Sequence, residues 1–294
     1  MAEKKVLVLR TCRADMSSTN GFKWPESGYV EAPDWEPTDE CGNGLHGWLW
    51  GEGDGSLGNW SFDAKWLVVE VDADKVVDLG GKVKFPFGKV VFCGSRLDAT
   101  NYLVKKAPGK AVIGAAVVAG ERGTATAGDC GKATAGDCGK ATAGERGKAT
   151  AGERGKATAG NHGTAMAGNR GTAMAGYRGT ATVEDQGTAT VEDLGKATAG
   201  EWGKATAGYG GKATAGYCGT ATAGHGGTAT AGAGGTATAG KNGTATAGRG
   251  ARRRPGTTAR RRPGATARRQ PGIRARRQPG ITARRRPDTG ASSA

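Results

Sequence analysis

Aromatic residues are scarce in this sequence of 294 residues. There are seven Trp, five Tyr and five Phe against 55 Gly, and six of the seven Trp fall within the first 66 positions. Because a large core needs bulky side chains, only the N-terminal part can build an ordinary one. Long apolar runs are also missing, and no stretch approaches the length of a membrane-spanning helix.

The sequence likewise lacks a compact cysteine framework. Its six Cys are scattered, and three of them occupy repeat positions at which other residues also occur, so disulfides are not required. The start, MAEKKVLVLRTC, contains an apolar run of only four residues before Arg10, which is shorter than the core of a signal peptide. We therefore expect a cytoplasmic protein with reduced thiols and no membrane span.

Net positive charge is scarce outside the C-terminal segment. The formal net charge is +15, but from Arg249 onward there are fifteen Arg, no Lys and one acid, Asp288, so this segment carries +14 and the rest of the chain about +1. The part that can fold has no basic bias. Any nucleic-acid binding is expected to be non-specific and to reside in the Arg-rich segment.

The region 1–105 has the pattern of a small α+β module of unknown function. Short runs of β-branched and bulky residues predict strands at Val6–Leu9, Trp66–Val71 and Lys89–Cys93. Residues Asp98–Leu103 predict a short helix with the first residue as its N-cap. Between Ser17 and Asn59 the chain is mostly Gly, Pro, Trp and acidic residues, which indicates long loops.

An octapeptide repeat occupies residues 119–246. Its consensus is A-G-x-x-G-[TK]-A-[TM], and sixteen copies follow one another without an insertion. Residues 106–118 include the apolar stretch AVIGAAVV in the same register. We interpret this stretch as a capping segment between the N-terminal module and the array.

Alternation within each repeat predicts a two-sheeted β-solenoid. In Gly123–Ala127, strand geometry directs Gly and Ala inward and Thr124 and Thr126 outward. Eight residues cannot close a coil, since two strands and two turns are needed, so two repeats are assigned to each coil. Eight such coils at ~4.8 Å spacing would form a rod roughly 40 Å long. Disorder is the alternative, because this composition buries little apolar surface.

The repeats at 207–230 read AGYGGKAT, AGYCGTAT and AGHGGTAT. They resemble the octapeptides of bacterial ice nucleation proteins, which run A-G-Y-G-S-T-x-T, and the resemblance extends over the sixteen repeats. It implies a β-solenoid whose paired threonines order water in an ice-like array. The matching surface positions are Thr220, Thr222, Thr228, Thr230, Thr236, Thr238, Thr244 and Thr246.

Departures from that pattern limit the activity that the resemblance implies. Seven repeats carry Lys in place of the first Thr, two end in Met, and seven of the sixteen keep Thr-Ala-Thr. The longest uninterrupted block is the last four repeats. Since ice nucleation needs a large ordered surface, we expect weak activity at most.

The N-terminal region resembles an uncharacterised module that precedes comparable octapeptide arrays in phage and prophage proteins. The residues that carry this resemblance are Cys41–His46 and the stretch from Trp66 through Asp78 to Cys93. It implies no known activity, but it favours a phage-associated protein.

Cys41 and His46 are the candidate catalytic residues of the module. A thiolate and an imidazole could act as a nucleophile and its base, or as half of a metal site. No paired spacing such as C-x-x-C accompanies them. A buried Cys and a loop-fixing His are therefore the simpler interpretation, and we expect neither a metal nor a cofactor.

The segment 247–294 keeps the period of eight but changes its composition. From Ala251 it reads ARRRPGTT, ARRRPGAT, ARRQPGIR, ARRQPGIT and ARRRPDTG. The coding string GGC AAG GCG ACG GCC GGG gives G-K-A-T-A-G, and read one nucleotide later it gives A-R-R-R-P followed by a Gly codon. We interpret the segment as the repeat array translated in a shifted frame; a selected basic arm is the alternative. Dense like charge and regular Pro predict disorder on either account.

Together these features favour a non-enzymatic, phage-type structural or binding protein, whose solenoid presents a repetitive face to a surface or a protein partner. Ice binding through the Thr pairs is one alternative. An N-terminal enzyme centred on Cys41 and His46 is the other.

The shifted-frame interpretation predicts the coding DNA. The nucleotide repeat should continue in phase across Gly250, and removing the one-nucleotide offset there should restore A-G-x-x-G-[TK]-A-T to the end of the array. Sequencing the gene tests this directly. DNA that reads as unrelated sequence in every frame after that codon would instead require a selected polycation.

Overall fold

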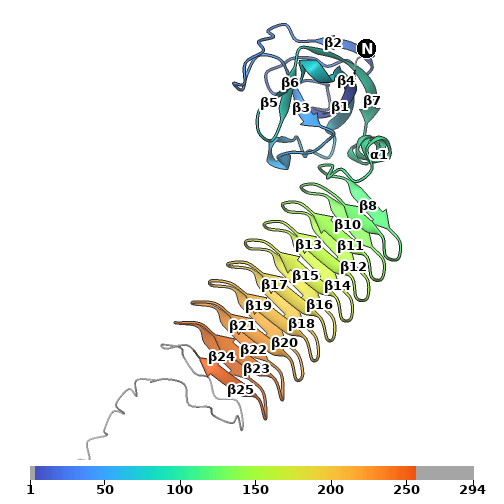
Figure 1. The fold of residues 1–294 in the computed structure, drawn as a ribbon. Coiled ribbons are helices and arrows are strands. Elements are labelled where there is room, and N and C mark those ends of the chain that lie inside the picture. The colour runs from blue at the N-terminus through green and yellow to red at the C-terminus, as the bar shows by residue number, and fades with distance from the viewer. Residues whose placement is uncertain (1–3, 256–294) are drawn as a thin grey trace, which may run out of the picture.

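The computed structural model describes residues 4–255. Figure 1 shows a small N-terminal domain at one end of a long stack of coils. The disorder predicted for the Arg-rich segment concerns mainly residues beyond 255, which lie outside the described residues.

One seven-stranded antiparallel sheet forms the frame of the N-terminal domain, in the order β2-β7-β4-β1-β3-β6-β5. The predicted strands are confirmed as parts of β1, β4 and β7. Two 3-10 turns, Gly55–Leu57 and Ala73–Lys75, interrupt the connections. The strands are β1 (Lys5–Cys12), β2 (Gly28–Glu31), β3 (Leu45–Leu49), β4 (Lys65–Asp72), β5 (Val77–Asp78), β6 (Val83–Phe85) and β7 (Phe87–Gly94).

Both faces of this sheet are covered. Along β1, Val6 and Val8 enter a cluster that contains Trp24, whereas Leu7 and Leu9 enter a second cluster on the other face. The first cluster is closed by the long loops, and the second by α1 and the apolar segment before the array. Burial on both faces explains why this strand reads as an unbroken apolar run.

Helix α1 (Arg96–Lys106) begins before the predicted position, and the predicted N-cap is wrong. The cap is Ser95, whose side chain accepts a hydrogen bond from the Asp98 backbone N–H. Asp98 is the third helical residue, and its carboxylate accepts from the Ser95 hydroxyl at 2.6 Å. Ser followed by an acid three residues later is a capping-box pattern, so the signal for the correct cap was present in the sequence.

Two parallel nine-stranded sheets form the solenoid, as predicted. Residues sixteen apart pair in register, as Ala133 does with Ala149 and Ala141 with Ala157, so each coil gives one strand to each sheet. The even sheet consists of β8 (Ala116–Ala119), β10 (Lys132–Ala135), β12 (Lys148–Ala151), β14 (Thr164–Ala167), β16 (Thr180–Val183), β18 (Lys196–Ala199), β20 (Lys212–Ala215), β22 (Thr228–Ala231) and β24 (Thr244–Ala247). The odd sheet consists of β9 (Thr124–Thr126), β11 (Lys140–Ala143), β13 (Lys156–Ala159), β15 (Thr172–Ala175), β17 (Thr188–Val191), β19 (Lys204–Ala207), β21 (Thr220–Ala223), β23 (Thr236–Ala239) and β25 (Arg252–Pro255).

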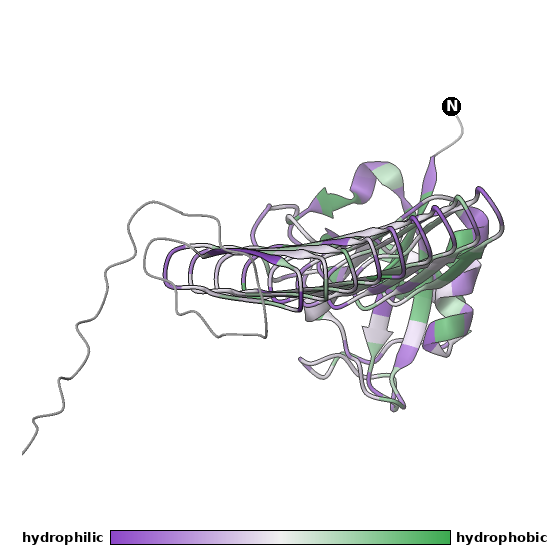
Figure 2. Ribbon diagram, turned by 90° about the horizontal axis from the view of Figure 1, so that it is seen from below, coloured by the Kyte–Doolittle hydropathy of each residue, from purple (hydrophilic) through white to green (hydrophobic). Residues whose placement is uncertain are grey.

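Alanine methyl groups fill the space between the two sheets, and Figure 2 shows how thin the stack is. Ala133 and Ala141 are fully buried, whereas their neighbours Lys132 and Lys140 are exposed. The predicted alternation is therefore confirmed. Because methyl groups supply little apolar volume, the backbone ladder between coils must supply much of the stability.

Glycine allows successive coils to approach one another closely. A Cβ atom on Gly136 would lie 2.8 Å from the backbone nitrogen of Glu121 in the preceding coil. A Cβ atom on Gly139 would lie 2.9 Å from the carbonyl oxygen of Gly123. Both distances are shorter than Cβ atoms normally show. The position of Gly139 is glycine in all sixteen repeats, as this stacking requires. The position of Gly136 is less strict, because Glu184 and Glu192 stand there in two repeats.

The second variable position of each turn is left-handed, even where it holds a bulky residue. Leu194 and Trp202 both have φ of 56°, a conformation that costs a non-glycine residue roughly 1–2 kcal/mol. Their backbone N–H groups donate at 2.8 Å to the carbonyls of Tyr209 and Tyr217 in the next coil. The coil-to-coil ladder therefore holds the turn conformation whatever side chain stands there.

The solenoid extends beyond the sixteen repeats at both ends. At the start, β8 from the apolar segment pairs with β10. At the other end, β25 pairs with β23, with Arg252 opposite Thr236, so residues 252–255 form a strand although the sequence assigns them to the tail. The period of eight continues through the change in composition, and this keeps the backbone in register.

The first coil is fixed to the N-terminal domain. The Asp129 carboxylate accepts from the Gly55 N–H at 3.1 Å and from the Glu145 N–H of the next coil at 2.7 Å. The Ile113 N–H donates to the Gly51 carbonyl at 2.9 Å, and the Ile113 side chain is fully buried in the core of the domain.

The steric role of the turn glycines predicts a stability effect. In Gly155→Ala, the new methyl group would lie 2.7 Å from the Ala151 Cβ of its own turn and 3.1 Å from the Gly139 carbonyl oxygen of the preceding coil. We expect a loss of about 1–3 kcal/mol in the free energy of unfolding, typical of overpacking, measured by denaturant titration of the β-sheet circular dichroism.

Glu153→Ala is the matched control in the same turn. The Glu153 side chain is exposed, and its backbone N–H, which donates to Asp137 at 2.8 Å, is unchanged by the substitution. Its effect should stay within about 0.5 kcal/mol. Equal stability of the two variants would contradict the close approach of the coils.

Candidate functional site

Outward side chains form two columns on each sheet of the solenoid. The first column holds the first residue of each strand, such as Thr228, and the second column holds the third residue, such as Thr230. Neighbours within a column are roughly 4.8 Å apart, and the two residues on one strand are about 6.6 Å apart. Each face is therefore a regular grid of small side chains.

The second column is a long run of threonine on both faces. Every one of these residues is half-buried by its neighbours, so its methyl and hydroxyl groups are held in a repeated arrangement. The run is five residues on the even sheet and four on the odd sheet: Thr182, Thr198, Thr214, Thr230 and Thr246, and Thr190, Thr206, Thr222 and Thr238.

The first column alternates between lysine and threonine. Lys residues occupy β10–β13 and again β18–β20, and Thr residues occupy β14–β17 and β21–β24. Because consecutive strands belong to opposite sheets, each group appears on both faces at the same level of the stack. The exposed lysines therefore form two belts around the solenoid, Lys132, Lys140, Lys148 and Lys156, and Lys196, Lys204 and Lys212.

The structure divides the predicted Thr block between the two faces. Strands β22 and β24 place Thr228, Thr230, Thr244 and Thr246 on the even sheet. Strands β21 and β23 place Thr220, Thr222, Thr236 and Thr238 on the odd sheet. In this block each face therefore has only two adjacent Thr-x-Thr strands. The sequence alone shows four consecutive Thr-x-Thr repeats, so each face receives half of them.

Two methionines end the Thr runs of the second column on the side nearer the N-terminal domain. Met166 on β14 and Met174 on β15 stand in the second column, one on each face, and are 38% and 39% exposed. They separate the Thr runs of the C-terminal coils from those nearer the N-terminal domain.

The candidate catalytic residues do not form a pair. Cys41 is exposed, and its Sγ lies 2.9 Å from the Nζ of Lys82. His46 is half-buried on β3, and its Nε2 has no hydrogen-bond partner within residues 4–255. Burial, together with the charges of Lys82, Arg10 and Lys84, lowers the pKa of His46 to about 4, so its ring is neutral at pH 7.

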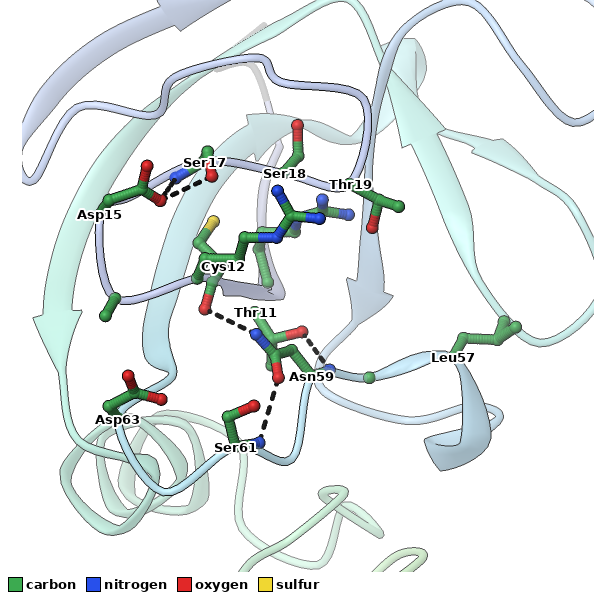
Figure 3. Close-up of a pocket in the computed structure, with 14 residues that line it drawn as sticks. Thr11, Cys12, Asp15, Ser17, Ser18, Thr19, Leu57, Asn59, Ser61 and Asp63 are labelled. Atoms are coloured by element: carbon green, nitrogen blue, oxygen red, sulfur yellow. Dashed lines mark hydrogen bonds between the residues drawn. The ribbon is translucent and has the colours of Figure 1, made fainter.

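A polar pocket of about 660 Å³ opens beside the end of β1 (Figure 3). The Asn59 backbone N–H donates to Thr11 Oγ1 at 3.0 Å, and its side-chain amide donates to the Cys12 carbonyl at 3.3 Å. Asp15 accepts from the Ser17 backbone at 3.0 Å and from its hydroxyl at 2.6 Å. These groups are used to hold the loops together. Burial raises the pKa of the Cys12 thiol, which disfavours the reactive thiolate.

Within the described chain, no group of three or more His, Cys, Asp or Glu side chains is arranged to hold a metal ion. Across residues 4–255 no helix is long and apolar enough to cross a membrane.

Comparison with known proteins finds two kinds of similarity. Residues 6–105 match a family described as a domain of unknown function, DUF7666. The chain is 41% identical over 106 residues to the ice nucleation protein InaU of Pantoea ananas, which covers 35% of this chain and 10% of InaU. It is 44% identical over 105 residues to an ice nucleation protein of Pseudomonas fluorescens, covering 35% of this chain and 9% of that protein.

A third relative is an ice nucleation protein of Xanthomonas campestris pv. translucens, 40% identical over 110 residues, with 37% of this chain and 7% of that protein covered. The chain thus spans a tenth or less of the length of these relatives. No solved structure matches the chain. The resemblance to ice nucleation proteins expected from the repeats is confirmed, and the N-terminal region is similar to the DUF7666 family.

Proposed function

We propose that the protein is a non-enzymatic binding protein whose solenoid orders water or binds ice through the threonine grids of its two faces. The observation that carries this proposal is the unbroken second column, Thr182 to Thr246 on the even sheet. The similarity to proteins named for ice nucleation supports the same choice of ligand.

A repeated array of threonines suits ordered water for a physical reason. Each threonine offers a methyl group and a hydroxyl, and the parallel strands place them at a constant spacing. The backbone ladder fixes this arrangement before binding, so little conformational entropy is lost when the water layer forms. Charged side chains would organise water around themselves, and the second column from β16 to β24 contains none.

The size of the grid limits the activity. Complete Thr-x-Thr strands on the even face occur at β16, β22 and β24, and Lys196 and Lys212 interrupt them. We infer that the chain acts on small ice crystals or adsorbed water more readily than it nucleates ice.

The lysine belts favour a second candidate, binding to an anionic surface or partner. Seven exposed lysines encircle the solenoid at two levels, and multivalent contact would strengthen weak individual contacts. Association with phage particles, a cytoplasmic location and non-specific nucleic-acid binding by the Arg-rich segment stay predictions from the sequence.

The ice-binding proposal predicts a gain of function. In the double variant Lys196→Thr with Lys212→Thr, the even face would carry Thr-x-Thr on five successive strands from β16 to β24. Because the uninterrupted grid grows from two strands to five, ice shaping and the droplet-freezing temperature should both increase over those of the unmodified protein.

A matched control removes the same amount of charge without adding threonine. Arg154→Ala with Arg170→Ala alters two exposed turn residues on consecutive coils, and it should leave ice growth unchanged. If the control raises the freezing temperature as much as the Thr variant, charge and not the grid is responsible. If the Thr variant and the unmodified protein both leave ice growth unaffected, the proposal fails.

A further inference from the structure

A second, smaller pocket lies in the N-terminal domain and is separate from the solenoid faces. Its volume is about 270 Å³, close to the lower limit of small-molecule sites. Arg10 of β1, His46 of β3 and Trp24 of the preceding long loop line it. Phe22 completes an aromatic wall with Trp24, and their ring centroids are 5.7 Å apart in an edge-to-face arrangement.

Three polar atoms around this pocket are buried without a hydrogen-bond partner in the described chain: Arg10 Nε, Trp24 Nε1 and His46 Nε2. Trp24 is only 4% exposed. Buried polar groups are nearly always paired, so three unpaired atoms around one pocket need an explanation. By contrast, the indole N–H groups of Trp48 and Trp60 donate to the carbonyls of Asp54 and Gly55.

The hydrogen-bonding character of the three atoms is determined by their surroundings. Arg10 Nε and Trp24 Nε1 each carry a hydrogen and can only donate. The His46 ring is hydrogen-bonded to the Gly44 backbone, and burial and the charges of Lys82, Arg10 and Lys84 keep it neutral. The other ring nitrogen, Nδ1, makes that bond as the donor and carries the ring hydrogen. In a neutral imidazole, Nε2 then has no hydrogen and can only accept.

Contacts among these residues position their side chains in the free protein. Arg10 Nη1 donates to the His46 carbonyl at 3.3 Å, and the guanidinium lies 5.4 Å from the centre of the Trp24 ring. The Asp34 carboxylate, also in the pocket wall, accepts from the Gly44 N–H at 3.0 Å. The pocket therefore offers two unpaired donors, one unpaired acceptor, an aromatic wall and one carboxylate, and the polar side chains of Ser18 and Asn20 also line it.

We propose that this pocket binds a small, neutral, planar ligand with an imide or amide edge. Carbonyl oxygens of the ligand accept from Arg10 Nε and Trp24 Nε1, and its N–H donates to His46 Nε2. The three atoms lie just within the pocket wall, so the Arg10 side chain shifts across the Trp24 ring as the ligand enters. This site is independent of the function proposed for the solenoid.

An anionic ligand fits this set of groups less well. A carboxylate or phosphate supplies acceptors alone, so it would leave His46 Nε2 unpaired. It would also place negative charge beside Asp34. An imide, in which two carbonyls flank one N–H, supplies two acceptors and one donor, and it satisfies all three atoms.

The experiment uses uracil as the imide probe with the full ¹⁵N-labelled chain. The Trp24 indole N–H resonance is assigned by its loss in Trp24→Phe. Uracil should shift this resonance saturably and leave that of Trp60 unchanged. By titration calorimetry, Trp24→Phe should weaken binding about tenfold, as for one buried hydrogen bond left unmade, whereas the matched control Trp60→Phe should bind as the unmodified protein does.

A comparison of ligands tests the role of His46 Nε2 as an acceptor. It needs no substitution that could unfold the domain. The probe 1,3-dimethyluracil keeps the ring and both carbonyls but has no N–H, and it should bind more weakly than uracil. Benzoate serves as the anionic probe. The proposal is overturned if uracil produces no saturable shift, if dimethyluracil binds as well as uracil, or if benzoate binds in preference to both.

Discussion

The close approach of one coil to the next determines the rest of the solenoid. Backbone groups of successive coils, fifteen to seventeen residues apart, are hydrogen-bonded in both sheets and in the turns, as for the N–H of Thr228 and the carbonyl of Gly211 at 2.9 Å. This ladder favours glycine where a Cβ would meet the preceding coil, and small apolar residues where two sheets share a thin core. Half of the positions in the octapeptide are thereby held to small residues in nearly every repeat, and the outward and turn positions remain free to vary.

The free positions are therefore where function can reside. Outward residues repeat at the strand spacing, so any property of a single repeat becomes a property of a whole face. Threonine makes a neutral, regular surface, and lysine makes a charged belt. The distribution of these two residues along the first column sets the size of each surface. The neutral stretches β14–β17 and β21–β24 are four strands each, and only the second keeps Thr-x-Thr throughout.

The N-terminal domain follows a different principle, because its core is built from large side chains on both faces of one sheet. The same bulk that stabilises it also encloses polar atoms of Arg10, Trp24 and His46 near a small pocket. Its last apolar segment closes this core at Ile113 and then becomes the first strand of the solenoid. The domain thus caps the array and contains the pocket for which we propose a small ligand.

The sequence alone determined the period, the two-sheeted solenoid and the inward and outward positions, because a repeated octapeptide places the same residue in the same local geometry every time. It also determined three strands of the N-terminal sheet, whose apolar runs are unmistakable. Only the tertiary structure decided which repeats share a face, since two repeats per coil divide Thr228 and Thr236 between opposite sheets. The same is true of the pocket at Arg10, Trp24 and His46, and of the contact between Cys41 and Lys82. Long loops contribute to these contacts, and loop paths depend on packing across the whole domain, which no local pattern encodes.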